Sequence, residues 1–231
     1  MRLDKLLSNL KYGSRKTIKM MAKKGEILVN GIPAYSSDIK IDPNYDKIIV
    51  NGHEVFYKEN IILAFNKPSG YLSSHEDELY PSLFDWIEAP YNQFDLKIAG
   101  RLDYDSEGLM ILTTNGKLVH QITHPNGHVQ KVYEVILDKA LEQKDAHKLL
   151  KGFNLLDGKG EPYEAKALNL TYDQRLATIT IDEGKFHQVK NMFSKLGYEV
   201  LKLKRTQIGK LMLDLAPGAY KEIEISDIFE R

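Results

Sequence analysis

The chain has 231 residues, 42% of them hydrophobic, which suits a globular protein of one or two domains with a well-buried core. It contains no cysteine, which excludes disulfides, thiolate metal sites and cysteine nucleophiles. The formal net charge is zero, which excludes a uniformly basic surface. However, residues 1–25 contain eight Lys or Arg and one acidic residue, and residues 185–210 contain seven Lys or Arg and one acidic residue.

These two basic segments on an otherwise acidic chain favour directed contact with phosphate groups. Two solvated helix faces would give the same counts and remain the alternative. No apolar run approaches membrane-spanning length, and the N-terminal residues lack the apolar core of a signal peptide. We therefore expect a cytoplasmic protein without a membrane partner.

Two short helices are predicted at the start of the chain. Leucines repeat with helical spacing over residues 3–11, and Ser14 can cap a second helix that ends before Gly25. Basic side chains at intervals of four residues share one face of this second helix, namely Arg15, Lys19 and Lys23. That face is a candidate surface for binding phosphate.

Two small hairpins are predicted next, because Asn30-Gly31 and Asn51-Gly52 are tight-turn pairs that each follow an apolar run. Two helices followed by hairpins, beginning Arg2-Leu3-Asp4-Lys5, resemble the S-four-type RNA-binding module over about residues 1–50. The resemblance implies contact with structured RNA through basic side chains, of which the candidates are Arg2, Arg15, Lys16, Lys19 and Lys23. Residues 51–60 are interpreted as a junction, so the predicted domains are 1–58 and 59–231.

The second domain begins with an apolar run at residues 61–65, which predicts a buried strand that ends near Lys67-Pro68 because proline cannot continue a central strand. Residues 110–112 predict another strand, preceded by the loop Gly100-Arg101-Leu102-Asp103. A loop carboxylate beside an arginine can act as a nucleophile or general base. A surface ion pair between Arg101 and Asp103 explains these four residues equally well.

Three more elements are predicted near the C-terminus. Residues 131–137 alternate as a strand with Tyr133 on its apolar face, and residues 199–204 form a strand with a basic face. Residues 189–196 form a helix whose apolar stripe leaves Lys190 free for a partner. Because no metal-ligand spacing surrounds His187, we interpret that residue as structural and predict no metal site.

The run GRLDYDSEGLMILTTNG, residues 100–116, closely resembles the active-site motif of the RsuA-like family, pseudouridine synthases that act on ribosomal RNA. Other motifs of that family follow the expected order along nearly the whole chain: Lys67-Pro68-Ser69-Gly70, Lys131-Val132-Tyr133-Glu134-Val135, Gly184 to Lys190 and Arg205 to Gly209. Several ordered motifs are far more specific than any one of them.

The resemblance implies roles for individual residues. Asp103, Tyr133 and Lys190 would be catalytic, with Lys190 as the partner of Asp103 and Tyr133 as a platform for a flipped uracil. Three other side chains would contact the substrate or RNA: Arg101, which would hold the flipped nucleotide, Lys67 and Gln188. Many relatives carry arginine where this chain has Lys190, and lysine lacks the bidentate fork of arginine, so we expect a looser pair.

The resemblance also implies an α+β fold, in which the helix-hairpin domain precedes a catalytic domain with a mixed, mainly antiparallel sheet. The implied activity is an isomerase that converts one uridine of 16S small-subunit rRNA, free or in an assembling subunit, into pseudouridine. The reaction oxidises nothing and releases no group, so it would need no cofactor. The enzyme is expected to be a monomer.

Alternative functions stay open at this point. The enzyme could act on large-subunit rRNA, or the chain could be a non-catalytic rRNA-binding factor in ribosome assembly that retains the fold. An aspartate-dependent hydrolase would need a second carboxylate, and we do not expect Asp105 or Glu107 to face the site.

Overall fold

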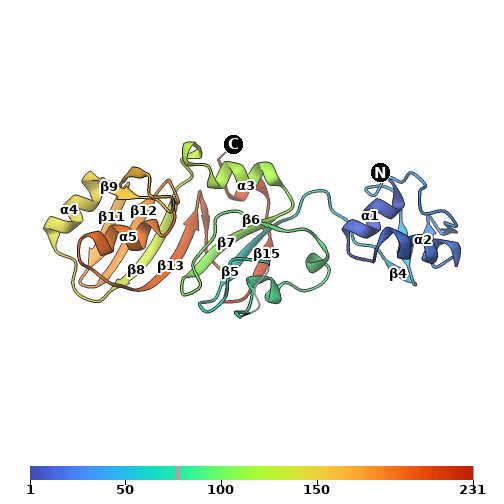
Figure 1. Ribbon diagram of the computed structural model, residues 1–231, viewed down its shortest axis with the longest axis horizontal. Helices are drawn as coiled ribbons and strands as arrows, with labels where there is room; N and C mark the ends of the chain where they lie inside the picture. Colours follow the sequence, from blue (N-terminus) through green and yellow to red (C-terminus); the bar gives the residue numbers. More distant parts are fainter. Residues whose placement is uncertain (76–78, 231) are drawn as a thin grey trace. The chain divides into compact units, whose positions relative to one another are not determined.

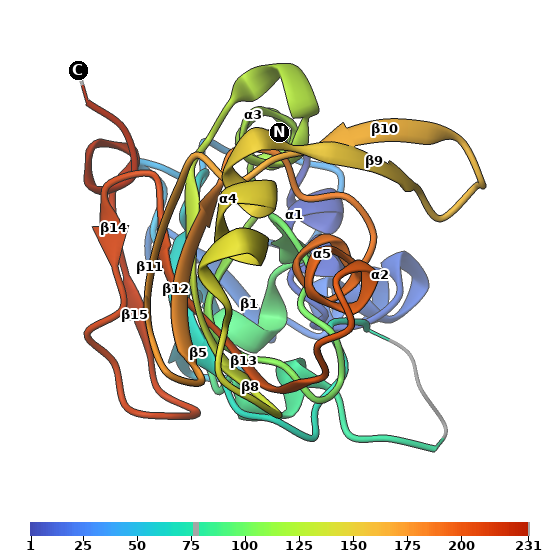
Figure 2. The same ribbon diagram turned by 90° about the vertical axis from the view of Figure 1, so that its left-hand side faces the viewer.

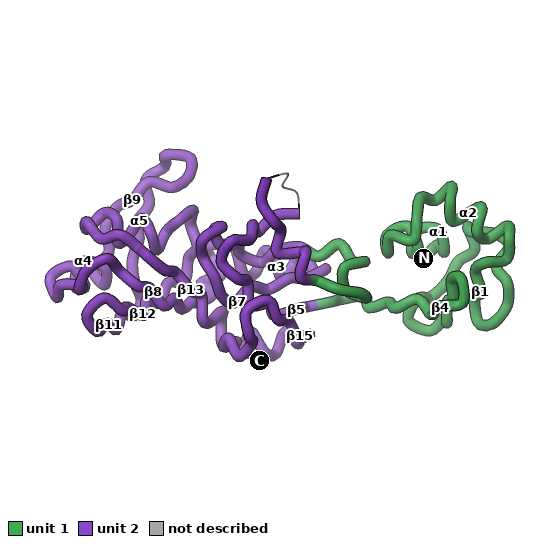
Figure 3. The backbone as a smooth tube through the Cα atoms, turned by 90° about the horizontal axis from the view of Figure 1, so that it is seen from below, with its two compact units in different colours: residues 1–61, 87–96 green, residues 62–86, 97–231 purple. Residues whose placement is uncertain are grey.

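The computed structural model describes residues 1–75 and 79–230, so Arg231, the last residue of the predicted catalytic domain, lies outside the described residues. The chain forms two compact units, residues 1–61 with 87–96 and residues 62–86 with 97–231 (Figure 3). Segment 87–96, which the sequence placed in the catalytic domain, belongs to the first unit because Phe56 lies edge-on to the rings of Tyr91 and Phe94, at centroid distances of 6.0 and 5.9 Å. None of the described helices is long and apolar enough to cross a bilayer.

The first unit contains two helices and a small antiparallel sheet. The helices are α1 (Leu3–Asn9) and α2 (Arg15–Lys23), and the strand order is β2 (Ile32–Pro33), β1 (Ile27–Val29), β3 (Ile48–Val50), β4 (His53–Glu54). Ser14 caps α2, as predicted, because its hydroxyl accepts a hydrogen bond from the Thr17 backbone N–H. Asn30 and Gly31 have φ of 53° and 81°, which the predicted tight turn between β1 and β2 requires.

The predicted cationic face of α2 is present. Ile18 and Ala22 are fully buried, whereas the basic side chains on the rest of the helix are exposed: Arg15, Lys16, Lys19 and Lys23. Arg2 pairs with Asp4, with 2.8 Å between Nη2 and Oδ2. Contact of these cations with RNA stays a prediction.

The second unit is built on one large sheet (Figures 1 and 2). Its strand order is β11 (Asn169–Asp173), β12 (Leu176–Ile181), β8 (Lys131–Leu137), β13 (Val200–Ile208), β7 (Glu107–Thr113), β5 (Ile62–Lys67), β15 (Tyr220–Glu222). Short strands β6 (Lys97–Ile98) and β14 (Leu211–Met212) pair with β7 and β13, and β9 (Phe153–Leu156) pairs with β10 (Pro162–Ala165). Among these strand pairs in the described chain, β7 and β13 form the only parallel pair, and all the others are antiparallel. This confirms the predicted mixed, mainly antiparallel sheet.

Helices cover different parts of this sheet (Figure 1). α3 (Gly116–Thr123) contacts β6 and β7, α4 (Gln143–Lys151) contacts β11, and α5 (Gln188–Lys195) contacts β13. Short 3-10 helices span Leu83–Trp86, Tyr91–Gln93, Pro125–Gly127 and Ile225–Asp227. One core cluster joins β5, β7, α3 and β13 through buried apolar side chains that include Ile62, Leu109, Ile111, Leu118, Ile122 and Ile208.

β5 ends at Lys67, directly before Pro68, as predicted, and it pairs with β7 as far as Lys67 and Gly108. Another strand differs from its prediction. In β13 a bulge between Val200 and Lys202 shifts the register, which leaves Leu201 51% exposed instead of sharing the buried face with Leu203.

The parallel pair in the middle of the sheet depends on a glycine. Gly108 has φ of 113°, and a Cβ added to it would lie 2.2 Å from the backbone oxygen of Arg205. Only glycine therefore allows the start of β7 to lie this close to β13. This contact brings the loop before β7 next to Arg205.

Candidate active site

The loop that carries Asp103 is fixed through its backbone. Lys67, at the end of β5, is fully buried, and its ammonium donates to the carbonyls of Pro68, Asp103, Tyr104 and Ser106 at distances from 2.6 to 3.3 Å. On the other side, Ser73 Oγ donates to the Leu102 carbonyl at 2.7 Å and accepts from the Leu102 N–H at 3.2 Å. These contacts hold the aspartate from both directions.

The expectation that Lys67 contacts RNA does not agree with this position. Its side chain has no exposed surface, and all of its recorded hydrogen bonds go to the loop backbone. Burial lowers the pKa of Lys67 to about 8, although the carboxylates of Asp105 and Asp103 oppose this shift. Lys67 is thus a positioning residue for the loop.

We predict that Lys67→Met lowers the free energy of unfolding by about 2–4 kcal/mol, because buried carbonyls lose their donor. Denaturant unfolding of the full chain measures this change. Lys117→Met, at an exposed lysine, is the control and should stay within about 0.5 kcal/mol of wild type. Equal stability of the two variants would contradict the positioning role.

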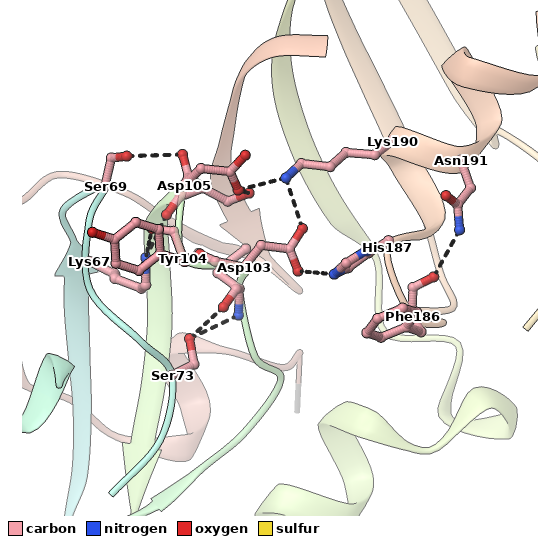
Figure 4. Close-up of polar contacts among 12 residues, drawn as sticks. Lys67, Ser69, Ser73, Asp103, Tyr104, Asp105, Phe186, His187, Lys190 and Asn191 are labelled. Carbon is pink, nitrogen blue, oxygen red and sulfur yellow. Dashed lines mark hydrogen bonds and ion pairs between the residues drawn. The ribbon is translucent and has the colours of Figure 1, made fainter. Parts of the chain in front are cut away.

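The carboxylate of Asp103 lies between two side chains that reach it from the start of α5 (Figure 4). Its Oδ1 is 3.0 Å from His187 Nε2, and its Oδ2 is 3.1 Å from Lys190 Nζ. The structure therefore contains the contact between Lys190 and Asp103 that the resemblance implied. Both carboxylate oxygens have a nitrogen partner.

Lys190 also contacts Asp105, with 2.6 Å between Nζ and Oδ1. Burial disfavours the charge of Lys190, but its hydrogen bonds to Asp105 and Asp103 outweigh burial and raise its pKa. Burial likewise opposes the charge of Asp105, but the hydrogen bond from Lys190 lowers its pKa. The pair is lost only as pH falls through the lowered pKa of Asp105 or rises through the raised pKa of Lys190, so both groups are charged across the neutral range.

His187 has an unusual backbone conformation. It precedes the first residue of α5 with φ of 50° and ψ of 27°, in the left-handed region, which costs a non-glycine residue about 1 kcal/mol or more. Its ring stacks on that of Phe186 with centroids 3.8 Å apart. The left-handed backbone thus accompanies a ring whose Nε2 lies within ion-pair distance of Asp103.

A cavity opens beside Asp103 and is also lined by Arg101, Tyr133 and Gln188. Tyr133 projects from β8, is 6% exposed, and its hydroxyl lies 3.5 Å from Nη1 of Arg205. Arg101 is exposed and forms no recorded ion pair within residues 1–75 and 79–230. The predicted substrate contacts other than Lys67 thus share one cavity with Asp103.

Gln188 is buried, and both ends of its amide are engaged within its own loop. Its Oε1 accepts from the Lys185 N–H and its Nε2 donates to Glu183, each at 3.0 Å. This geometry favours shaping of the cavity wall over contact with RNA. Within the described part of the chain, no group of three or more His, Asp or Glu residues could hold a metal ion.

The sequence matches the models of two known protein families. Residues 61–195 match the model for RNA pseudouridylate synthase, and residues 1–45 match the model for the S4 domain. This chain belongs to the RNA pseudouridylate synthase family. It is therefore an isomerase that acts on RNA, and its first unit carries the predicted RNA-binding module.

Full-length relatives of this synthase agree. The chain is 40% identical to an uncharacterized RNA pseudouridine synthase of Bacillus subtilis, over 96% of this chain and 95% of the relative. It is 36% identical to ribosomal small subunit pseudouridine synthase A of Pasteurella multocida, over 99% and 98%. A crystal structure titled pseudouridylate synthase superimposes with a TM-score of 0.66 at 33% identity, covering 99% of this chain and 98% of that one.

Sequence reasoning missed three contacts of the synthase site. Asp105 does reach the site through Lys190, and His187, interpreted as only structural, contacts Asp103. No helical spacing signalled the His187 contact, because His187 lies before α5 with a left-handed backbone. Arg205, counted in the basic segment, is 2% exposed and donates to the carbonyls of Leu109 and Gly100 at 2.7 and 2.8 Å.

Proposed function

We propose that this synthase converts one uridine of 16S small-subunit rRNA into pseudouridine in the cytoplasm, acting as a monomer with Asp103 as the catalytic residue. The full-length relatives named for the small subunit support this choice of RNA. The observation that carries the catalytic assignment is the Asp103 carboxylate, held by His187 and Lys190 at the edge of the cavity.

The reaction breaks the bond between ribose C1′ and uracil N1 and forms one between C1′ and C5. C5 loses a proton and N1 gains one, so the composition of the RNA is unchanged. Asp103 can attack C1′ or remove a proton from the ribose, and both routes need an ionised carboxylate close to the sugar. In this account Tyr133 stacks on the flipped base, and Arg101 holds the flipped nucleotide.

The choice of RNA is tested by incubating purified synthase with 16S rRNA, 23S rRNA and partly assembled small subunits, and then mapping pseudouridine. We expect one modified uridine in the small-subunit RNA. Modification of 23S rRNA alone would support the large-subunit alternative. Tight binding without modification of any of these RNAs would support the assembly-factor alternative.

We predict that the exposed cations of α2 contribute to RNA affinity through phosphate contacts. A variant with Arg15, Lys16, Lys19 and Lys23 changed to Gln should bind RNA more weakly and with a shallower dependence of log Kd on log salt, because each lost phosphate contact removes about 0.7 to 0.9 from the slope.

The control changes four exposed lysines outside the two basic segments to Gln, namely Lys139, Lys144, Lys151 and Lys166. It should alter the slope less. If the α2 variant and wild type give the same slope, α2 does not contact the RNA. Neutralising side chains in the full chain is preferable to deleting residues 1–58, because the deletion would expose Tyr91 and Phe94, which contact Phe56.

A further inference from the structure

Two cationic side chains line the cavity beside Asp103 and are almost completely buried. Lys131 is 4% exposed and Arg205 is 2% exposed. They project from the neighbouring strands β8 and β13, on which Tyr133 and Arg205 are paired in register. Lys131 and Arg205 therefore place two positive charges at one wall of the cavity.

Both cations hydrogen-bond only to neutral acceptors. Lys131 Nζ donates to the Val129 carbonyl at 2.7 Å, and Arg205 donates to two carbonyls and toward the Tyr133 hydroxyl. Over the described residues, neither cation has a recorded carboxylate within ion-pair distance. Because Arg has five N–H donors and Lys three, each keeps donors for a ligand.

The carboxylates of the cavity are engaged elsewhere. Asp103 contacts His187 and Lys190, and Glu183 accepts a hydrogen bond from Gln188. Buried charges in proteins are normally paired, because an unpaired one loses its hydration without compensation. An uncompensated pair of cations thus favours a negatively charged occupant of the cavity.

The protonation of Lys131 is consistent with such a site. Burial lowers the pKa of Lys131 to about 8, with a further lowering by the charge of Arg205 and an opposing effect of Asp182. The ammonium therefore stays charged at neutral pH, although burial deprives it of hydration, which costs free energy. An anion in the cavity would relieve that cost.

We propose that Lys131 and Arg205 bind the uracil anion that exists between detachment and reattachment of the base. When the C1′–N1 bond breaks, its electron pair stays with the base, and the charge spreads over N1 and the carbonyl oxygens. C1′ then bonds to an Asp103 oxygen, or the ribose gives a proton to Asp103. In either route C5 next supplies the electron pair for the new bond to C1′, while the C1′–O bond to Asp103 breaks or Asp103 returns its proton to the ribose. C5 then releases its proton and N1 takes one up.

Two cations beside the detached base would act in two ways. They would stabilise the charge that develops as the bond breaks, which is where preorganised donors contribute most. They would also keep the base in the cavity while it turns. This inference rests on the isomerisation itself and is independent of which rRNA is modified.

The test measures single-turnover rates at saturating RNA, on the RNA in which the wild-type enzyme forms pseudouridine. Lys131→Met should slow isomerisation by about 100-fold and leave the Kd for RNA unchanged, because the anion forms only after binding. The wild-type rate should fall as pH rises through about 8, where Lys131 loses its charge. Lys131→Arg should remain active, because arginine stays protonated, and its rate should fall less than that of wild type over this range. The fall that is left comes from Lys67, whose pKa is also about 8.

The control is Lys139→Met, an exposed lysine just after β8, which should keep the wild-type rate and pH profile. Lys131→Met should unfold at the same or a higher temperature, because it removes a buried unpaired charge. A purely structural lysine would instead give a lower melting temperature and an unchanged rate. Wild-type turnover in Lys131→Met, or a wild-type pH profile in Lys131→Arg, would overturn the proposal.

Discussion

Asp103→Asn should reduce pseudouridine formation by about a thousandfold or more, because the amide keeps the shape of the side chain and removes the charge that either route requires. Folding and RNA affinity should change little, since Lys67 and Ser73 hold the loop through its backbone. Single-turnover rates, binding and melting curves of the same preparation measure all three properties.

Asp105→Asn is the matched control, because it removes the other carboxylate that contacts Lys190. The side chain of Asp105 is 66% exposed and does not line the cavity, so we expect a loss of no more than about tenfold. Turnover of Asp103→Asn above a few per cent of wild type, or a larger loss in Asp105→Asn, would sink the assignment of Asp103.

Lys190→Met should slow isomerisation by about 100-fold with little change in RNA affinity. Without the ammonium, Asp103 and Asp105 lose the cation that lies between them, and their repulsion should displace the Asp103 carboxylate. The loss should be smaller than for Asp103→Asn, because His187 still contacts Asp103 and Arg101 lines the same cavity. The measurement is the single-turnover rate constant of isomerisation at saturating RNA, compared among wild type, Lys190→Met and Asp103→Asn.

Two further variants make this prediction specific. Lys190→Arg should recover most of the activity, since arginine supplies the same charge with more donors. Lys195→Met removes an exposed lysine of the same helix and should keep the wild-type rate. Wild-type turnover in Lys190→Met would show that its contact with Asp103 contributes nothing to the reaction.

Local patterns predicted most of the fold. The Ser14 cap, the Asn-Gly turn after β1 and the alternation in β8 involve residues close together in the chain, and the structure confirms each. The bulge in β13 was not predictable, because it depends on pairing with β8. The grouping of segment 87–96 with the first unit was not predictable either, because its aromatic contacts are made with Phe56, more than thirty residues earlier.

The site was predicted unevenly, for a related reason. Asp103, Tyr133 and Lys190 stand in motifs whose spacing can be read directly, and the structure brings them to one site. Lys67 was expected to contact the substrate or RNA, and Arg205 was counted in a basic segment, because most lysines and arginines are exposed. Their burial depends on carbonyls 36 and 96 residues away, at Asp103 and Leu109, which no local pattern reveals.

The most direct test of the account is to map pseudouridine in the rRNA of cells that lack this gene and of the same cells carrying wild-type or Asp103→Asn protein. The account predicts that one pseudouridine of 16S rRNA disappears with the gene, returns with the wild-type protein and stays absent with equal amounts of the variant. Return of that pseudouridine with Asp103→Asn, or a 16S rRNA whose pseudouridines do not depend on the gene, would contradict it.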